Sequence, residues 1–333
     1  AAVATALFAA TPWSVWLGVS TVPEALTAGL VAAGAPLALA DESTRGRRLV
    51  GAACILLATL SRYEAWPVAA AAAGILAFRA ATGRARAADV VPAVAAMLAG
   101  PVAWMAWNAH AHGGDPLHFV ARVTRFRQTS GQASIPFGEK LLVYPRALVI
   151  EAPEVALLAC STFGALASGR LRERVAPLAA VMGAVALFLL FGVARDGAPT
   201  HHPARALVVL FPLAAIAGTE VAATTIGRAG ARAKAALLLA AVIALSIVWP
   251  RAWRTPPGTD LANDRSPQVA MGLELRARGG AERYRVTPCA FEHFALIAAL
   301  GAPERVEVVK PEKTATAPPP SPVDAPCPRL ESL

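Results

Sequence analysis

Charged side chains that could bind an anion or move a proton lie beside the apolar stretches of this chain. Arg62 and Glu64 form a polar tip between two apolar runs, and Glu24 precedes another run. Arginine offers a permanent charge and a fork of N–H donors that suits phosphate, and a carboxylate can take the proton of a hydroxyl group. Ionisable groups at membrane depth are costly unless they face a cavity or a partner, so we expect them to share one water-filled cavity. The set comprises Glu24, Arg62, Tyr63, Glu64, His110, His112, Asp115, His118, Arg122, Arg125, Arg127, Arg146, Glu151, Glu154, Arg195, Asp196, His201, His202 and Arg205.

Two interpretations of these arginines stay open. They form a pocket for a phosphate or diphosphate group at the membrane interface, or they contact lipid headgroups while Arg62 and Glu64 pair to hold the turn. For the set as a whole we favour the phosphate pocket, because loops on the outer face of a membrane should hold few arginines.

The histidines suggest substrate contact more than metal binding. His110, His112, Asp115 and His118 have a spacing that metal ligands can adopt, but the pattern is not specific, and we interpret them as interfacial polar residues. His202 lies in a polar loop and is a candidate for contacting substrate. We therefore assign no metal-binding residue.

The sequence motifs that are typical of other reaction types are absent from the sequence. No Ser/His/Asp set, P-loop or glycine-rich dinucleotide motif is present. The four cysteines have no metal-ligand spacing. Cys54 and Cys160 lie in apolar runs, whereas Cys289 and Cys327 lie in a polar region and could form a disulfide if that region is extracytoplasmic.

The composition places these residues in a membrane protein. Of the 333 residues, 56% are hydrophobic and 16% are charged, whereas soluble domains hold about 25% charged residues. The formal net charge of +9 comes mostly from short loops between apolar runs, which indicates membrane topology and not nucleic-acid binding. The chain begins within an apolar stretch, so we expect it to start inside a membrane helix.

Short basic loops fix the expected orientation. The loops 41–48, 79–87, 169–174 and 227–234 each carry three Lys or Arg residues. They fall on one side if the spans alternate, and the positive-inside rule makes that side cytoplasmic. The sequence predicts about nine spans: 1–20, the run ending at Leu39, the two arms of the hairpin 47–86, 88–107, 151–168, 175–194, 206–226 and 235–250.

The remaining segments lie outside the predicted spans. Residues 117–128 alternate Phe119, Val123 and Phe126 with arginines at helical spacing, which predicts a helix in the membrane interface. From residue 251 the chain is polar, and 267–279 and 290–300 read as helices while 283–288 and 305–309 read as strands. The fold class is thus an all-α polytopic membrane bundle (1–250) with a small extracytoplasmic α/β domain (251–310) and a disordered tail rich in Pro and Ala (311–333).

Four local motifs resemble polytopic glycosyltransferases of the GT-C type, the mannosyltransferase and aminoarabinose-transferase kind that use polyprenyl-phosphate sugars. TPWSVWLGVSTVPEAL resembles the family's outer-face segment that ends in Glu, here Glu24. LSRYEAW resembles its turn with Arg and Glu, here Arg62 and Glu64. WNAHAHGGDPLHF resembles its entry to the interfacial helix, and HHPARALVVLFPLAAIAG resembles its late His/Arg and Pro region. These motifs cover residues 1–225.

The resemblance implies an activity and its participants. It implies transfer of a sugar from a polyprenyl-phosphate donor to a lipid, glycan or protein acceptor at the outer face of the plasma (inner) membrane, with no nucleic-acid partner. No cofactor is certain, and a divalent metal stays open. Besides Glu24 as a support residue, the expected substrate- and phosphate-binding residues are Arg62, Glu64, Asp115, Arg122, His202 and Arg205.

The chain departs from the family at two points. The family's catalytic Asp lies in a first outer loop that has no counterpart here, so we expect it upstream of residue 1. Ala206 stands where the family has Tyr after the late Arg.

Two other functions compete with this one. A transporter or lipid-handling protein without chemistry would favour an internal repeat and helices broken at the midplane. We find no repeat in the sequence. A scaffold would use the polar C-terminal region to bind a protein partner outside the cell.

Overall fold

A computed structural model of the chain describes residues 23–129, 136–167, 169, 172–195, 203–228, 230, 266–280, 282–287, 292–309 and 329–332. The chain divides into two compact units, Ala1–Gly258 and Thr259–Leu333. The first unit is helical in its described part, and the second combines helices with a small sheet.

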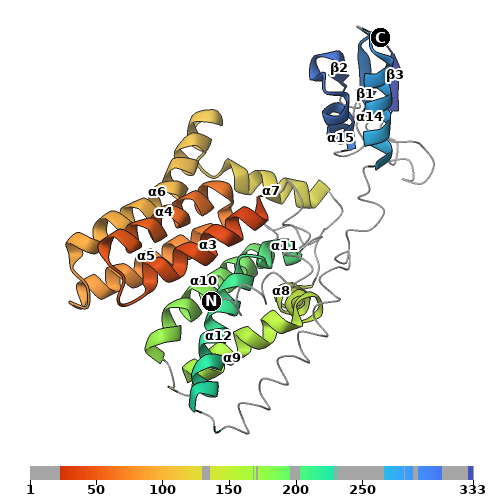
Figure 1. Ribbon diagram of the computed structural model, residues 1–333. Coiled ribbons are helices and arrows are strands. Elements are labelled where there is room, and N and C mark those ends of the chain that lie inside the picture. Colours follow the sequence, from red (N-terminus) through yellow and green to blue (C-terminus); the bar gives the residue numbers. More distant parts are fainter. Residues whose placement is uncertain are drawn as a thin grey trace. The chain divides into compact units, whose positions relative to one another are not determined.

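The hairpin predicted for 47–86 is present in the first unit. It consists of α4 (Arg45–Ser61), the 3-10 turn η1 (Tyr63–Ala65) and α5 (Trp66–Ala81), preceded by α3 (Glu24–Leu39) and followed by α6 (Ala87–Ala111). The Thr44 hydroxyl caps α4 by accepting a hydrogen bond from the Arg47 amide at 3.3 Å. α4 packs between α3 and α6, and these helices run side by side in Figure 1.

Small residues let α3 and α4 approach closely. A Cβ added at Gly34 would lie 2.9 Å from the carbonyl oxygen of Gly51, and one added at Gly51 would lie 2.6 Å from the backbone nitrogen of Ala38. Backbone contacts this short leave no room for a side chain, and glycine at such positions is common between membrane helices. The crossing therefore fixes where α3 lies against α4.

The described residues of the second half of this unit form six helices. They are α7 (His118–Thr129), α8 (Phe137–Glu151), α9 (Pro153–Ala167), α10 (Arg172–Ala194), α11 (Pro203–Leu207) and α12 (Leu210–Arg228). α12 packs against α9, α10 and α3, and α11 packs against α8. The range predicted for an interfacial helix, 117–128, thus forms α7.

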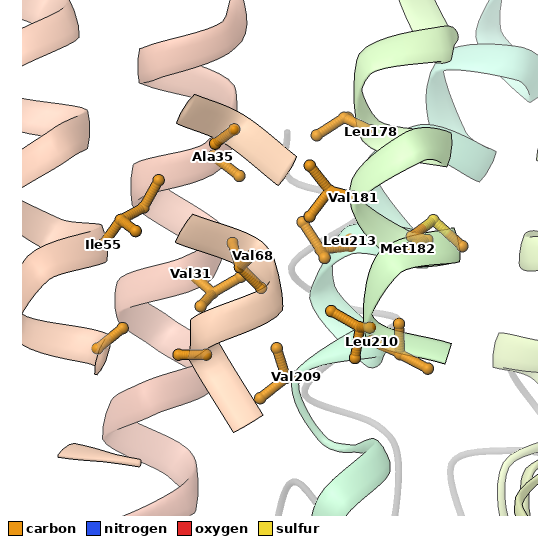
Figure 2. Close-up of a cluster of buried hydrophobic side chains, with 14 of the residues drawn as sticks. Val31, Ala35, Ile55, Val68, Leu178, Val181, Met182, Val209, Leu210 and Leu213 are labelled. Atoms are coloured by element: carbon orange, nitrogen blue, oxygen red, sulfur yellow. The ribbon is translucent and has the colours of Figure 1, made fainter. Parts of the chain in front are cut away.

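The two halves share one apolar core. Figure 2 shows Val31 of α3 and Val68 of α5 on one side, with Val181 of α10 and Leu213 of α12 on the other. All four side chains are completely buried. This core anchors α3, and so Glu24 at its start, against the α11–α12 region.

Two described helices are long and apolar enough to cross a membrane, α6 and Val175–Ala194 of α10, or three spans if α8 and α9 are counted as one bent span. They are consistent with the predicted helical membrane protein. α8 and α9 meet at a 113° bend. The full count of nine spans stays a prediction, and the runs 1–20 and 235–250 lie outside the described residues.

The second unit contains α14 (Ser266–Arg278), β1 (Tyr284–Thr287), α15 (Glu292–Leu300), η3 (Pro303–Arg305), β2 (Val306–Val308) and β3 (Arg329–Ser332). The sheet order is β2-β1-β3, with β2 parallel and β3 antiparallel to β1. Leu275, Tyr284 and Leu300 form its buried centre. The two helices and the strands β1 and β2 lie where the sequence predicts them. The boundary at residue 251, the extracytoplasmic location and the status as a separate α/β domain stay predictions.

One prediction for the tail is wrong at its end. Residues 329–332 were expected to be disordered, but they form β3. Once β2 pairs with one side of β1, the other side still offers unpaired backbone N–H and C=O groups, and a returning segment can pair with them.

Candidate functional site

The first turn of α3 and the turn after α4 meet at one end of the hairpin. The Thr27 hydroxyl lies 2.8 Å from the Pro23 carbonyl oxygen and 3.0 Å from the Ser61 hydroxyl, which joins the start of α3 to the end of α4. Arg62 leaves the helix with an extended backbone. The Trp66 indole N–H donates to the Thr59 carbonyl oxygen at 3.1 Å and closes the turn. These contacts hold Glu24 and Arg62 close together.

Four charged side chains, which we call the Glu24 cluster, connect at this end: Glu24, Arg62, Glu64 and Arg205. Arg62 Nη1 donates to Glu24 Oε1 at 2.6 Å. The same guanidinium donates to both oxygens of Glu64, from Nε at 3.0 Å and from Nη2 at 2.5 Å. Arg205, from α11, donates to Glu24 Oε1 from Nε at 2.8 Å and also from Nη2.

The carboxylates of the Glu24 cluster lie inside and the arginines lie toward its surface. Glu24 is completely buried and Glu64 is 3% exposed, whereas the side chains of Arg62 and Arg205 are 20% and 32% exposed. Two positive and two negative charges balance. The bonds above use three of the five N–H groups of Arg62 and two of the five of Arg205, so both arginines keep donors for a ligand.

The environment of the turn changes the acidity of two of its side chains. Burial alone would lower the pKa of Arg62, but the hydrogen bond with Glu64 and the charges of Glu64 and Glu24 outweigh it and raise that pKa. Burial, and then the charge of Glu64, raise the pKa of Tyr63 to about 12. Arg62 is therefore charged and the Tyr63 phenol neutral at physiological pH.

Helix α7 contacts the turn through one aromatic side chain. The Phe119 ring lies 5.4 Å from the Trp66 ring in an edge-to-face arrangement and 6.1 Å from the Tyr63 ring. Edge-to-face pairs of this kind are favourable. The predicted interfacial helix is therefore attached beside the Glu24 cluster.

Two predicted site residues lie near this attachment but outside the Glu24 cluster. Asp115 Oδ1 accepts a hydrogen bond from the Leu117 amide at 2.9 Å, and Asp115 Oδ2 lies 3.8 Å from His118 Nδ1. Arg122 is exposed. Within the described ranges, no hydrogen bond or ion pair joins Asp115 or Arg122 to the Glu24 cluster.

Of the predicted site residues, the structure brings together Glu24, Arg62, Glu64 and Arg205. His202 lies outside the described residues. The rings of His112 and His118 stack at 3.9 Å, but in the described part of the chain no group of three or more His, Cys, Asp or Glu side chains could hold a metal ion. Cys289 and Cys327 are likewise outside the description, so their pairing stays a prediction.

Sequence reasoning missed two features of this site. It did not predict the contact between Glu24 and Arg205, which lies 181 residues further along the chain. It also did not foresee that Phe119 would pack on the turn; its place in the apolar stripe of residues 117–128 was the available signal.

Comparison with known proteins gives no relative: no family model, curated protein or solved structure matches the chain.

Proposed function

We propose that this protein is an integral-membrane glycosyltransferase. It moves a sugar from a polyprenyl-phosphate donor to a lipid, glycan or protein acceptor on the extracytoplasmic face. The observation that carries the proposal is the Glu24 cluster, in which two partly exposed arginines are held by two buried carboxylates. The resemblance of four motifs to GT-C enzymes supports the same activity.

Phosphate is the leaving group of this reaction. Its negative charge grows as the glycosidic bond breaks, and N–H groups already aimed at it stabilise that charge. Glu64 engages Arg62 at both oxygens, and Glu24 binds Arg62 and Arg205 at a single oxygen. These bonds orient the guanidinium groups before the donor arrives. The donor's isoprenoid chain would lie in the bilayer while its phosphate reaches the arginines at the interface.

The charge balance of the Glu24 cluster makes directed hydrogen bonding the basis of phosphate recognition. Because the two arginines and two glutamates cancel, there is little net attraction for anions in general. Selectivity then depends on the geometry of the unused N–H groups of Arg62 and Arg205. We keep Glu24 as a support residue, since its Oε1 is occupied by both arginines. The base that deprotonates the acceptor is not assigned to any of residues 1–333.

Donor binding is the first test, because it does not need that base. The protein in lipid vesicles is titrated with polyprenyl-phosphate sugars, and Arg62→Ala and Arg205→Ala are expected to weaken binding at least tenfold. Asp41→Asn is the matched control: Asp41 pairs with Arg79 just beyond the other end of α3 and is 64% exposed. Unaltered binding by both arginine variants, with folding verified by thermal unfolding, would refute the proposal.

A second candidate function is transport or lipid handling. The 113° bend between α8 and α9 favours it, because broken helices are frequent at the binding sites of transporters. Reconstituted vesicles separate the two functions. Movement of a labelled lipid-linked sugar across the bilayer without cleavage of its glycosidic bond would support transport, and formation of a new glycoside would support transfer.

A further inference from the structure

We propose that the second carboxylate oxygen of Glu24, Oε2, accepts a hydrogen bond from a hydroxyl group of the donor's sugar. This inference rests on the proposed function and deepens it. The arginines of the Glu24 cluster would bind the phosphate, while Glu24 recognises the sugar attached to it.

The two oxygens of Glu24 have opposite environments. Oε1 accepts three N–H groups, one from Arg62 and two from Arg205. Oε2 is buried and has no hydrogen-bond partner among the described residues. Both oxygens of Glu64, by contrast, are engaged by Arg62. A buried carboxylate oxygen without a donor is unfavourable, so the free protein is held with one acceptor ready for a ligand.

The chemistry of Oε2 limits what the ligand can be. A carboxylate oxygen only accepts hydrogen bonds, so the phosphate itself is excluded from this position. In the part of the chain that is described, no set of side chains around it could complete a metal site. A hydroxyl group can donate the hydrogen bond that this oxygen lacks. A sugar linked to phosphate carries hydroxyl groups within a few ångströms of that phosphate.

Because Oε2 is buried, a ligand reaches it only after a local rearrangement of the site. Arg205 is the most exposed member of the Glu24 cluster and comes from the five-residue helix α11. A bound phosphate that draws Arg205 outward would open a path to the Glu24 carboxylate, while Arg62 still holds Oε1. Phosphate binding and sugar recognition would therefore occur together.

The test compares a lipid with and without its sugar. Binding of undecaprenyl phosphate and of undecaprenyl phosphate carrying a hexose or pentose is measured on the wild type and on Glu24→Gln, without acceptor. In Glu24→Gln we expect the arginines to bind the amide oxygen. The NH₂ group then takes the place of Oε2, and it cannot accept a hydrogen bond from a hydroxyl group. Glu24→Gln should weaken binding of the sugar-bearing lipid at least tenfold more than it weakens binding of the sugar-free lipid.

Glu64→Gln is the matched control. It makes the same change of charge in the same cluster, but at a residue whose oxygens are both occupied by Arg62. It should alter binding of the two lipids by the same factor. A series of donors, each lacking one ring hydroxyl, is then tested on the wild type. Removal of one particular hydroxyl should weaken donor binding as much as Glu24→Gln does. Removal of the same hydroxyl should not weaken donor binding to Glu24→Gln any further.

The outcomes separate this inference from the proposed function. If the wild type binds both lipids but Glu24→Gln changes their affinities equally, the sugar contact is refuted and phosphate binding stands. If no deoxy donor loses affinity on the wild type, the sugar contact is refuted even should the variant misfold. If neither lipid binds the wild type, both proposals fall.

Discussion

Arg62 is the residue on which the Glu24 cluster depends most, because it bonds to both carboxylates. Arg62→Ala leaves Glu64 without its charged partner, and removal of one member of a buried pair is costly. We expect Arg62→Ala to lower the free energy of unfolding by about 3 kcal/mol. Arg205→Ala should cost about 1 kcal/mol, since Arg205 is one-third exposed and Glu24 keeps Arg62.

Chemical unfolding in detergent micelles, followed by circular dichroism, measures both values. Asp41→Asn serves as the reference, because the exposed Asp41 pairs with Arg79 outside the Glu24 cluster. A larger loss for Arg205→Ala than for Arg62→Ala would contradict this order and would make Arg205 the centre of the Glu24 cluster.

Tyr63 supplies a pH-dependent signal from the same turn. Its pKa of about 12 in the folded protein exceeds the usual value of about 10. The folded state therefore binds the proton more tightly, and this contribution to stability is complete below about pH 10 and is lost as the pH rises through about 12. Ultraviolet titration of phenolate, as the difference between wild type and Tyr63→Phe, should show a midpoint near pH 12. A midpoint near 10 would mean that Tyr63 is exposed to water.

At the scale of elements, the crossing of α3 and α4 offers a matched pair of substitutions. A Cβ at Gly34 meets the Gly51 carbonyl oxygen and the Ile55 side chain at 2.9 Å, whereas one at Gly29 of the same helix meets nothing within 4 Å. Gly34→Ala should therefore destabilise the protein by about 1–3 kcal/mol, and Gly29→Ala should leave stability unchanged or slightly raised. Thermal unfolding of the two variants decides; equal melting temperatures would show that the helices cross elsewhere.

Sequence patterns predicted most helices of the first unit because apolar runs and polar loops alternate sharply. α3, the hairpin of α4 and α5, α6, α7 and α10 lie where these patterns place them. The bend between α8 and α9 was not predicted. Its signal was Pro153, which lacks an N–H group and disfavours helix in the residue before it; Ala152 accordingly has a non-helical backbone.

All four members of the Glu24 cluster were among the predicted site residues, but so were Asp115 and Arg122, which lie outside it. Residue type and motif resemblance selected these four residues, yet neither shows that Glu24 contacts Arg62 and Arg205. The Arg62–Glu64 pair was foreseeable because the residues are two apart. The Glu24–Arg205 contact depends on packing of α3 against α12, which local sequence does not encode.

At the scale of the whole molecule, the prediction concerns sidedness. In a variant without the four native cysteines, Leu117→Cys should react with a membrane-impermeant maleimide in intact cells. Thr82→Cys and Ala167→Cys should react only after the membrane is permeabilised, because they adjoin basic loops that the positive-inside rule places in the cytoplasm. All three positions are exposed. Labelling of Leu117→Cys only after permeabilisation would reverse the orientation and refute the outer-face reaction.

The spacing of the Glu24 contacts along the chain also bears on biogenesis. Glu24 meets Arg62 after 38 residues but meets Arg205 only after 181. At a synthesis rate of roughly 5–20 residues per second, the ribosome needs on the order of ten seconds to make the segment between the two arginines. During that interval the part of the Glu24 cluster already made holds two glutamates, Glu24 and Glu64, and one arginine, Arg62. Until α11 is made, Arg62 is the one arginine of the Glu24 cluster that can bind Glu24, so the cluster is completed only late in synthesis.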